Sequence, residues 1–211
     1  MKLISTSFED NSILSERLCF GAPDGNGGMR FGGNRSPHLA WQEVPDAVRS
    51  FILICTDPDV PADPTIVNVP DTTIRQAVPR TTLYHWVVVD IPPDVREFAE
   101  GEFSDGVTVK GKPGPNGPRG VRLGVNSYTD WLKGNPDMEG SYYGYDGPCP
   151  PLNDSVTHRY VFTLYAVDFA RCPVGERFTG AEALEALKGH VVKTAKLTGL
   201  YSLNPKSRGA T

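Results

Sequence analysis

The stretch Ser50-Phe51-Ile52-Leu53-Ile54-Cys55-Thr56-Asp57-Pro58-Asp59 places a short apolar run directly before two carboxylates. Residues 51–55 are apolar without a helical period and rich in β-branched or aromatic side chains, which is typical of a buried strand. Residues 87–91 and 160–167 show the same pattern. We expect these three segments to form the centre of a β-sheet.

The composition supports a sheet-dominated architecture. The 211 residues include 22 glycines and 19 prolines, which cluster between the apolar runs. This distribution is typical of short strands joined by turns. Chain length favours a single domain over residues 1–211.

The C-terminal third carries two further expected elements. Residues 174–178 are a weaker strand candidate. Residues 181–197 are predicted to form a helix because Leu184, Leu187, Val191 and Ala195 recur at a helical spacing. Thr179 followed by Glu182 predicts a capping box at its start.

Charge and hydropathy exclude several classes of partner. The net charge is −4, with both signs dispersed along the chain, so attraction to nucleic acid is not expected. No apolar run approaches the ~18 residues that span a bilayer, and the first ten residues lack the apolar segment of a signal peptide. We expect a cytoplasmic protein without a membrane span.

The cysteines do not suggest a metal or disulfide framework. Cys19, Cys55, Cys149 and Cys172 are widely spaced and form no Cys-x-x-Cys pair. Cys55 is predicted to be a small core residue. Cys149 lies in a proline-rich loop near the candidate site, but nothing in the sequence lowers its pKa.

Several polar residues gather at predicted strand ends. Residues two apart on a strand face the same way, so we expect Asp57 and Asp59 to point together, and we expect the same of His158 and Tyr160. His85 and His158 are each predicted at the entrance of a strand. Together with the Gly147-Pro148 backbone, these residues would line one polar cleft. Its side-chain groups would be two carboxylates, two imidazoles and a phenol.

The chemistry of such a cleft favours an anionic ligand. A carboxylate beside an imidazole fixes its tautomer and favours the protonated ring, which attracts an anion. The phenol adds a donor, and a remaining carboxylate would accept an amine carried beside the anion. A zwitterionic phosphate ester such as phosphoethanolamine satisfies all these groups.

Five motifs, in this order, resemble the phosphatidylethanolamine-binding protein family and its bacterial Raf-kinase-inhibitor-like branch. They span roughly residues 31–168 and are Asn34-x-Ser36-Pro37, Asp57-Pro58-Asp59-x-Pro61, His85-Trp86, Gly147-Pro148-x-Pro150-Pro151 and His158-Arg159-Tyr160. The resemblance implies a mainly β fold in which a large antiparallel sheet packs with a smaller sheet and a few flanking helices, one of them near the C-terminus.

The resemblance also implies the ligand-binding residues. Those carried over are Asp57, Asp59, His85, Gly147, Pro148, His158 and Tyr160, with Pro61 and Trp86 bordering the cavity. Arg159 is expected to be structural, because it faces away from its neighbours. Long inserts at residues 62–84 and 100–143 are expected to reshape the cavity mouth.

The resemblance therefore predicts a non-enzymatic protein that binds phosphorylated or other small anionic ligands without a cofactor. It also implies regulation of a protein partner such as a kinase or protease, and a homodimer. Two alternatives remain open. One is a metal-dependent hydrolase that uses the histidines and aspartates, although no His-x-x-x-His spacing or nucleophile elbow supports it. The other is a protein-binding adaptor that uses residues 100–143 and has a vestigial pocket.

Overall fold

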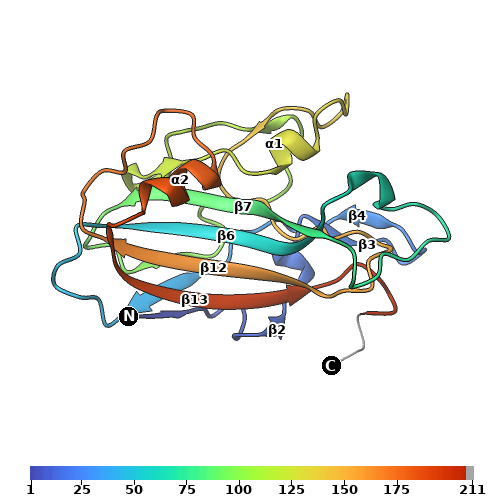
Figure 1. Ribbon diagram of the computed structural model, residues 1–211, viewed down its shortest axis with the longest axis horizontal. Coiled ribbons are helices and arrows are strands. Elements are labelled where there is room, and N and C mark those ends of the chain that lie inside the picture. The colour runs from blue at the N-terminus through green and yellow to red at the C-terminus, as the bar shows by residue number, and fades with distance from the viewer. Residues whose placement is uncertain (208–211) are drawn as a thin grey trace.

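The computed structural model describes residues 1–207. Four long strands lie side by side at its centre: β7 (Arg80–Ile91), β6 (Ser50–Pro61), β12 (His158–Val167) and β13 (Val191–Tyr201), each antiparallel to its neighbour (Figure 1). The three predicted core strands are thus confirmed. The predicted segments lie within β6, β7 and β12, which are longer than the apolar runs.

A smaller sheet packs against the large one. The large sheet is completed by β10 (Arg122–Leu123) beside β7 and by β2 (Ser12–Ile13), which runs parallel to β13. The smaller sheet has the order β1 (Lys2–Ile4), β5 (Leu39–Gln42), β8 (Glu97–Phe98) and is antiparallel. The predicted mainly β fold with two packed sheets is confirmed.

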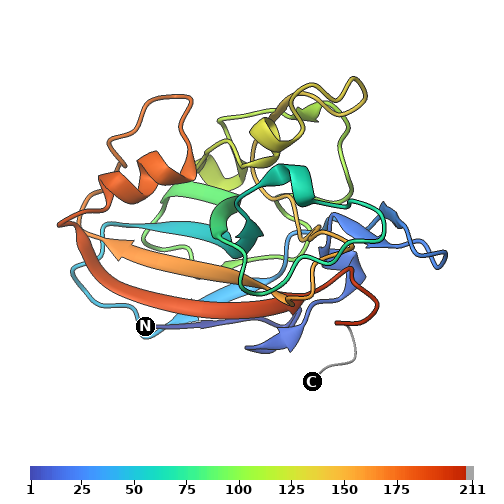
Figure 2. The same ribbon diagram turned by 45° about the vertical axis from the view of Figure 1, so that its right-hand side comes forward.

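The remaining elements are short and lie around the large sheet (Figure 2). Two small ribbons consist of β3 (Gly21–Pro23) with β4 (Met29–Phe31), and of β9 (Gly111–Lys112) with β11 (Ser141–Tyr142). The helical segments are η1 (Glu16–Leu18), η2 (Pro64–Ile66), η3 (Pro118–Gly120), α1 (Tyr128–Trp131) and α2 (Gly180–Ala186). None of the helices within residues 1–207 is long and apolar enough to cross a membrane.

Alternation along the central strands divides the core into two layers. Phe51, Leu53 and Cys55 join the main core together with Leu39 and Trp41 of the smaller sheet. Ile52 and Ile54 face the opposite side of β6, where α2 covers them. A strand buried on both faces reads as a continuous apolar run, which explains the sequence of residues 51–55. Cys55 is 1% exposed, as predicted.

The predicted helix over residues 181–197 is wrong in its second half. Helix α2 ends at Ala186, and Gly189 adopts a left-handed φ of 80° before β13 begins. Within β13, Ala195, Leu197 and Tyr201 are buried at the two-residue spacing of a strand. The same apolar residues satisfy both periods over a short window, so the pattern alone did not distinguish them.

The predicted strand at residues 174–178 is also wrong. This segment is irregular, and two of its carbonyl groups accept hydrogen bonds from a side chain and not from a neighbouring strand. The buried guanidinium of Arg122 donates from Nη1 to the carbonyls of Val174 and Gly175, at 2.9 and 3.0 Å. Phe178, at the end of the segment, is buried beneath α2.

The capping box at the start of α2 is confirmed and yields a prediction. Thr179 Oγ1 accepts from the Glu182 backbone N–H, and the Glu182 carboxylate accepts from the Thr179 backbone N–H. Thr179→Ala should lower the free energy of unfolding by about 1 kcal/mol. Urea denaturation at pH 7 measures the change. Glu185→Gln, on the same helix outside the box, should have little effect, and equal effects of both variants would contradict this account.

Candidate functional site

A cavity of about 170 Å³ opens at the end of the large sheet that carries the β3–β4 ribbon. Its polar lining consists chiefly of Asp57, His85, His158 and Tyr160. These side chains come from β6, β7 and β12, which are adjacent strands of the large sheet. The structure therefore brings together four of the residues predicted from sequence.

A bulge in β7 positions His85. Trp86 pairs with Cys55 and Tyr84 pairs with Thr56, so His85 is an extra residue between two paired positions. A regular strand would point His85 and Trp86 to opposite faces. Here Trp86 joins the main core with Tyr160, and the His85 ring lies 5.1 Å from the Tyr160 ring. His85 thus lies inside β7 and not at its entrance, and the bulge directs it into the cavity wall.

His158 is held between two carboxylates. Its Nδ1 lies 2.7 Å from Asp57 Oδ2, and its Nε2 lies 3.1 Å from Asp154 Oδ2. Asp154 is in turn held by Arg80, with nitrogen to oxygen distances of 2.5 and 3.2 Å. Both carboxylates and the imidazole are almost completely buried. These four residues form a continuous chain of alternating charge.

The two carboxylates keep His158 protonated. Burial opposes the charge on the ring, but the hydrogen bonds with Asp154 and Asp57 outweigh it and raise the pKa of His158 to about 9. Both N–H groups of the imidazolium donate to carboxylates, so the ring has no N–H left for a ligand. His158 therefore organises the floor of the cavity, whereas we expected its charge to meet the anion directly.

Two other polar atoms of the cavity lack partners. His85 Nδ1 donates to the Asp146 carbonyl at 2.8 Å, which leaves Nε2 as an unpartnered buried atom. Tyr160 Oη is also buried and unpartnered. Burial lowers the pKa of His85 despite the opposing effect of Asp57 and of Asp146, so the ring is neutral at pH 7. Buried polar groups are normally satisfied, so this pair is the strongest indication of a ligand position.

A buried polar network holds Asp146, the hydrogen-bond partner of His85, in place. The Asp146 backbone N–H donates to the His85 carbonyl at 3.0 Å, which makes the contact reciprocal. The Asp146 carboxylate accepts from Asn34 and Asn126 side-chain amides at 2.8 and 2.7 Å, and from Lys112 Nζ at 2.9 Å. Burial lowers the pKa of Lys112, an effect that Asp146 partly offsets. This network fixes the tautomer of His85.

Gly147 and Pro148 support the cavity wall from behind and are not among its lining residues. The Gly147 N–H donates to Asn34 Oδ1 at 2.7 Å, and its carbonyl accepts from Tyr128 Oη at 2.8 Å. A Cβ on Gly147 would meet the Leu18 carbonyl oxygen at 2.1 Å, so only glycine fits. The Pro148 carbonyl accepts from Gly21 at 3.0 Å. Cys149, Pro150 and Pro151 of the same loop do line the cavity.

Three other predicted residues also lie outside the lining. Asp59 does not point with Asp57: the β6 register shifts between Asp57 and Val60, and Asp59 binds Arg159 through contacts of 2.8 to 2.9 Å. The expectation that both carboxylates face the cleft is wrong for this reason. Pro61 pairs with Arg80 in the ladder, and Trp86 is buried in the main core.

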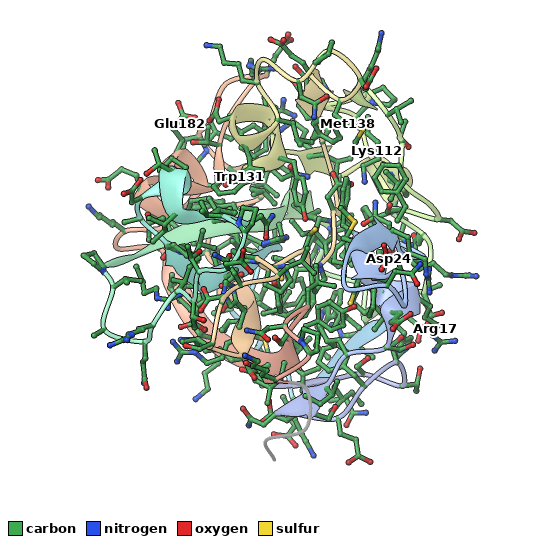
Figure 3. All side chains as sticks on the ribbon, turned by 90° about the vertical axis from the view of Figure 1, so that its right-hand side faces the viewer. Arg17, Asp24, Lys112, Trp131, Met138 and Glu182 are labelled. Atoms are coloured by element: carbon green, nitrogen blue, oxygen red, sulfur yellow. The ribbon has the colours of Figure 1, made fainter. Side chains whose placement is uncertain are left out.

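The two inserts build much of the cavity mouth. Residues 62–84 contribute Val67, Asn68 and Leu83, and residues 100–143 contribute Tyr128, Trp131 and Leu132. Met29 of β4 completes this side. Figure 3 looks onto this end of the molecule, with Trp131 and the hairpin residue Asp24 on either side.

Cys149 is not an activated thiol. Burial raises the pKa of Cys149 to about 12, which disfavours the nucleophilic thiolate. Within residues 1–207, no group of three or more histidine, cysteine, aspartate or glutamate side chains is arranged to hold a metal ion. The polar residues that line the cavity, apart from Cys149, are Asp57, Asn68, His85, Tyr128, His158 and Tyr160.

Sequence reasoning did not identify several residues of the site. They are Arg80, Lys112, Asn126, Tyr128, Asp146 and Asp154, which come from the inserts, their borders or the proline-rich loop. Only Asp154, four residues before His158, gave a local signal. The others reach the site because segments far apart in the sequence pack together, and no periodicity indicates that packing.

Comparisons with known proteins agree with this architecture. The model of the family described as phosphatidylethanolamine-binding protein matches residues 4–202. The UPF0098 protein YbhB of Escherichia coli is 34% identical over 96% of this chain and 100% of its own length. A UPF0098 protein of Methanothermobacter thermautotrophicus is 35% identical over 81% of this chain and 84% of its own.

Solved structures show the same fold. The crystal structure of Escherichia coli YbcL, described as a new member of the mammalian PEBP family, superposes with a TM-score of 0.68 at 25% identity. That match covers 95% of this chain and 97% of YbcL. A putative PEBP homologue from Chlamydia trachomatis gives a TM-score of 0.61 at 27% identity, over 95% and 96% of the two chains.

The raised pKa of His158 makes stability depend on pH. A histidine whose pKa rises from 6.5 to about 9 on folding stabilises the protein fully below pH 6.5. That contribution, about 3 kcal/mol for a shift of this size, is lost as the pH rises through about 9. The free energy of unfolding, measured in urea from pH 6 to pH 9.5, should fall over this window.

His158→Gln is the control, because glutamine does not titrate. At pH 6 the variant should be less stable by about 3 to 5 kcal/mol, since it leaves two carboxylates without their cation. The gap between wild type and variant should narrow as the pH approaches 9.5. A gap that stays constant over the range would show that His158 is not the titrating group.

Proposed function

This chain belongs to the phosphatidylethanolamine-binding protein family, and we propose that it binds phosphorylated or other small anionic ligands in the cavity formed by β6, β7 and β12. The observation that supports the proposal most directly is the unpartnered pair of buried atoms, His85 Nε2 and Tyr160 Oη. Both residues are among those that line the cavity. Inorganic phosphate and the phosphate end of a phosphoethanolamine-like headgroup fit this pair.

The two atoms differ in how they would meet an anion. Tyr160 keeps its hydroxyl proton, because burial raises the pKa of its phenol well above 10, so it donates. Neutral His85 presents a lone pair at Nε2, because Nδ1 carries the proton donated to Asp146. Protonation converts Nε2 into a donor. Anion binding is therefore coupled to the uptake of one proton by His85.

We propose that the cavity binds the anion without catalysing a reaction on it. In the metal-dependent hydrolase alternative, Asp57 and His158 would hold a metal or activate water. Those two side chains are hydrogen-bonded to each other at 2.7 Å, and the second nitrogen of His158 is hydrogen-bonded to Asp154. Both ring nitrogens of His158 are therefore already engaged. Regulation of a kinase or protease partner, a homodimer and a cytoplasmic location stay predictions.

The coupling predicts a pH dependence of anion binding. Because the pKa of unliganded His85 lies below 6.5, affinity should rise as the pH falls through 6.5 and level off below that pKa. The steepest rise is roughly tenfold per pH unit, since one proton is taken up. Calorimetric titration with sulfate between pH 5 and pH 8 tests this, because sulfate keeps a constant charge over that range.

A second prediction concerns the phenol. Tyr160→Phe removes one hydrogen bond to a charged ligand and should weaken phosphate binding by roughly 10- to 100-fold. Tyr165→Phe, on the opposite face of the same strand, is the matched control and should bind normally. Equal affinity of wild type and Tyr160→Phe, or release of phosphate from a phosphate ester by the protein, would contradict the proposed function.

A further inference from the structure

The cavity offers no unpaired carboxylate to a cationic ligand group. Asp57 is the only carboxylate among its lining residues within the described part of the chain. Asp57 Oδ2 is bonded to the His158 imidazolium, and Oδ1 accepts from the Asp59 backbone N–H at 2.8 Å. Asp59 and Asp154 lie nearby, but each is bound to an arginine. The ammonium of a zwitterionic headgroup would therefore leave water without gaining an uncompensated anion.

Apart from Asn68, the side chains at the mouth of the cavity are mostly apolar. Val67, Leu83 and Leu132 line it together with Met29 and Trp131. Met29 and Trp131 remain 40% and 41% exposed, although they face a cavity. Seven large apolar side chains are exposed within residues 1–207, and four of them, Met29, Phe31, Val69 and Trp131, belong to the segments around this mouth. Exposed apolar side chains that gather around a cavity mark a surface for an apolar ligand group.

Aromatic rings connect the polar floor to this mouth. The His85 ring lies 5.6 Å from the Tyr128 ring, and Tyr128 lies 4.5 Å from Phe20. Phe20 contacts Phe31 of β4 at 5.7 Å in an edge arrangement. Of these rings, those of His85, Tyr128 and Phe20 belong to lining residues of the cavity. Contacts with such rings favour aromatic groups beyond the area they bury.

From these observations we propose that the cavity selects anions that carry an apolar, flat substituent, of which aryl phosphates are the simplest class, over zwitterionic phosphate esters. The anionic end occupies the position between His85 and Tyr160, and the ring lies between Met29 and Trp131. This inference rests on the proposed function, because it assigns the substituent of the same anionic ligand.

Three phosphate compounds test it by calorimetry at pH 6: inorganic phosphate, phosphoethanolamine, which also carries an ammonium, and phenyl phosphate, which carries an aromatic ring. Phenyl phosphate should bind roughly tenfold more tightly than phosphoethanolamine, the order expected when part of an aromatic ring leaves water. Trp131→Ala should remove most of that margin without changing the affinity for inorganic phosphate.

Met29→Ser provides a second variant, on a different segment, in case Trp131→Ala disturbs α1. Val109→Ala is the control, because Val109 is 56% exposed and is not a lining residue of the cavity. Trp131 gives an independent signal: Trp41 and Trp86 are at most 1% exposed, so quenching of the exposed tryptophan should follow phenyl phosphate binding.

The outcomes separate the inference from the proposed function. The inference is overturned if phosphoethanolamine binds as tightly as phenyl phosphate or more tightly, a result that an ammonium stacked on Trp131 would produce. The proposed function still stands in that case if Tyr160→Phe weakens the binding of all three compounds. A margin for phenyl phosphate that survives both mouth variants also overturns it. Failure of all three probes to bind overturns the proposed function and the inference together.

Discussion

The chain of charges from Asp57 through His158 and Asp154 to Arg80 is the constraint on which the site depends. Buried charges are tolerated only when each finds a partner, and loss of one partner is costly. Asp154 lies in the loop before β12, so the loop must fold back over the strand end to reach His158. That path places Cys149, Pro150 and Pro151 over the strands and forms one wall of the cavity.

The same chain decides which residues face the ligand. Its two carboxylates, one imidazolium and one guanidinium cancel formally, and both N–H groups of His158 are used. The floor therefore presents little net charge. The atoms left without partners are on His85 and Tyr160, so selection of an anion depends on a phenolic donor and on proton uptake by His85. A histidine with a lowered pKa is suited to that role, because its charge appears when the anion supplies the compensating interaction.

The sequence predicted the strands well because burial on both faces leaves a direct pattern. Residues 51–55 form a continuous apolar run, residues 87–91 and 160–167 are interrupted only by Asp90 and Thr163, and each segment lies in a central strand. Residues 191–197 were misassigned because Leu187, Val191 and Ala195 fit a helical spacing, whereas the left-handed Gly189 had already ended the helix. Asp57, His85, His158 and Tyr160 were found from the motif order. Asp146, Lys112 and Arg80 were missed because their contacts depend on loop paths.

Two strand irregularities explain why the cavity lies where it does. The registers of β6 and β7 shift at Cys55/Thr56 and again between Asp57 and Val60. The first shift lets two consecutive residues, His85 and Trp86, serve the same side of the sheet, one in the cavity wall and one in the core. The second turns Asp59 away to Arg159, so Asp57 is the only one of these two β6 carboxylates that contacts His158. A regular ladder would form the same sheet, but it would not place a carboxylate that is hydrogen-bonded to His158 (Asp57) beside a histidine with an unpartnered nitrogen (His85). The local loss of pairing at these two shifts is thus the structural cost of the site, and both lie toward the end of the strands where the inserts cover them, whereas a third shift, between Phe51 and Leu53, lies at the other end.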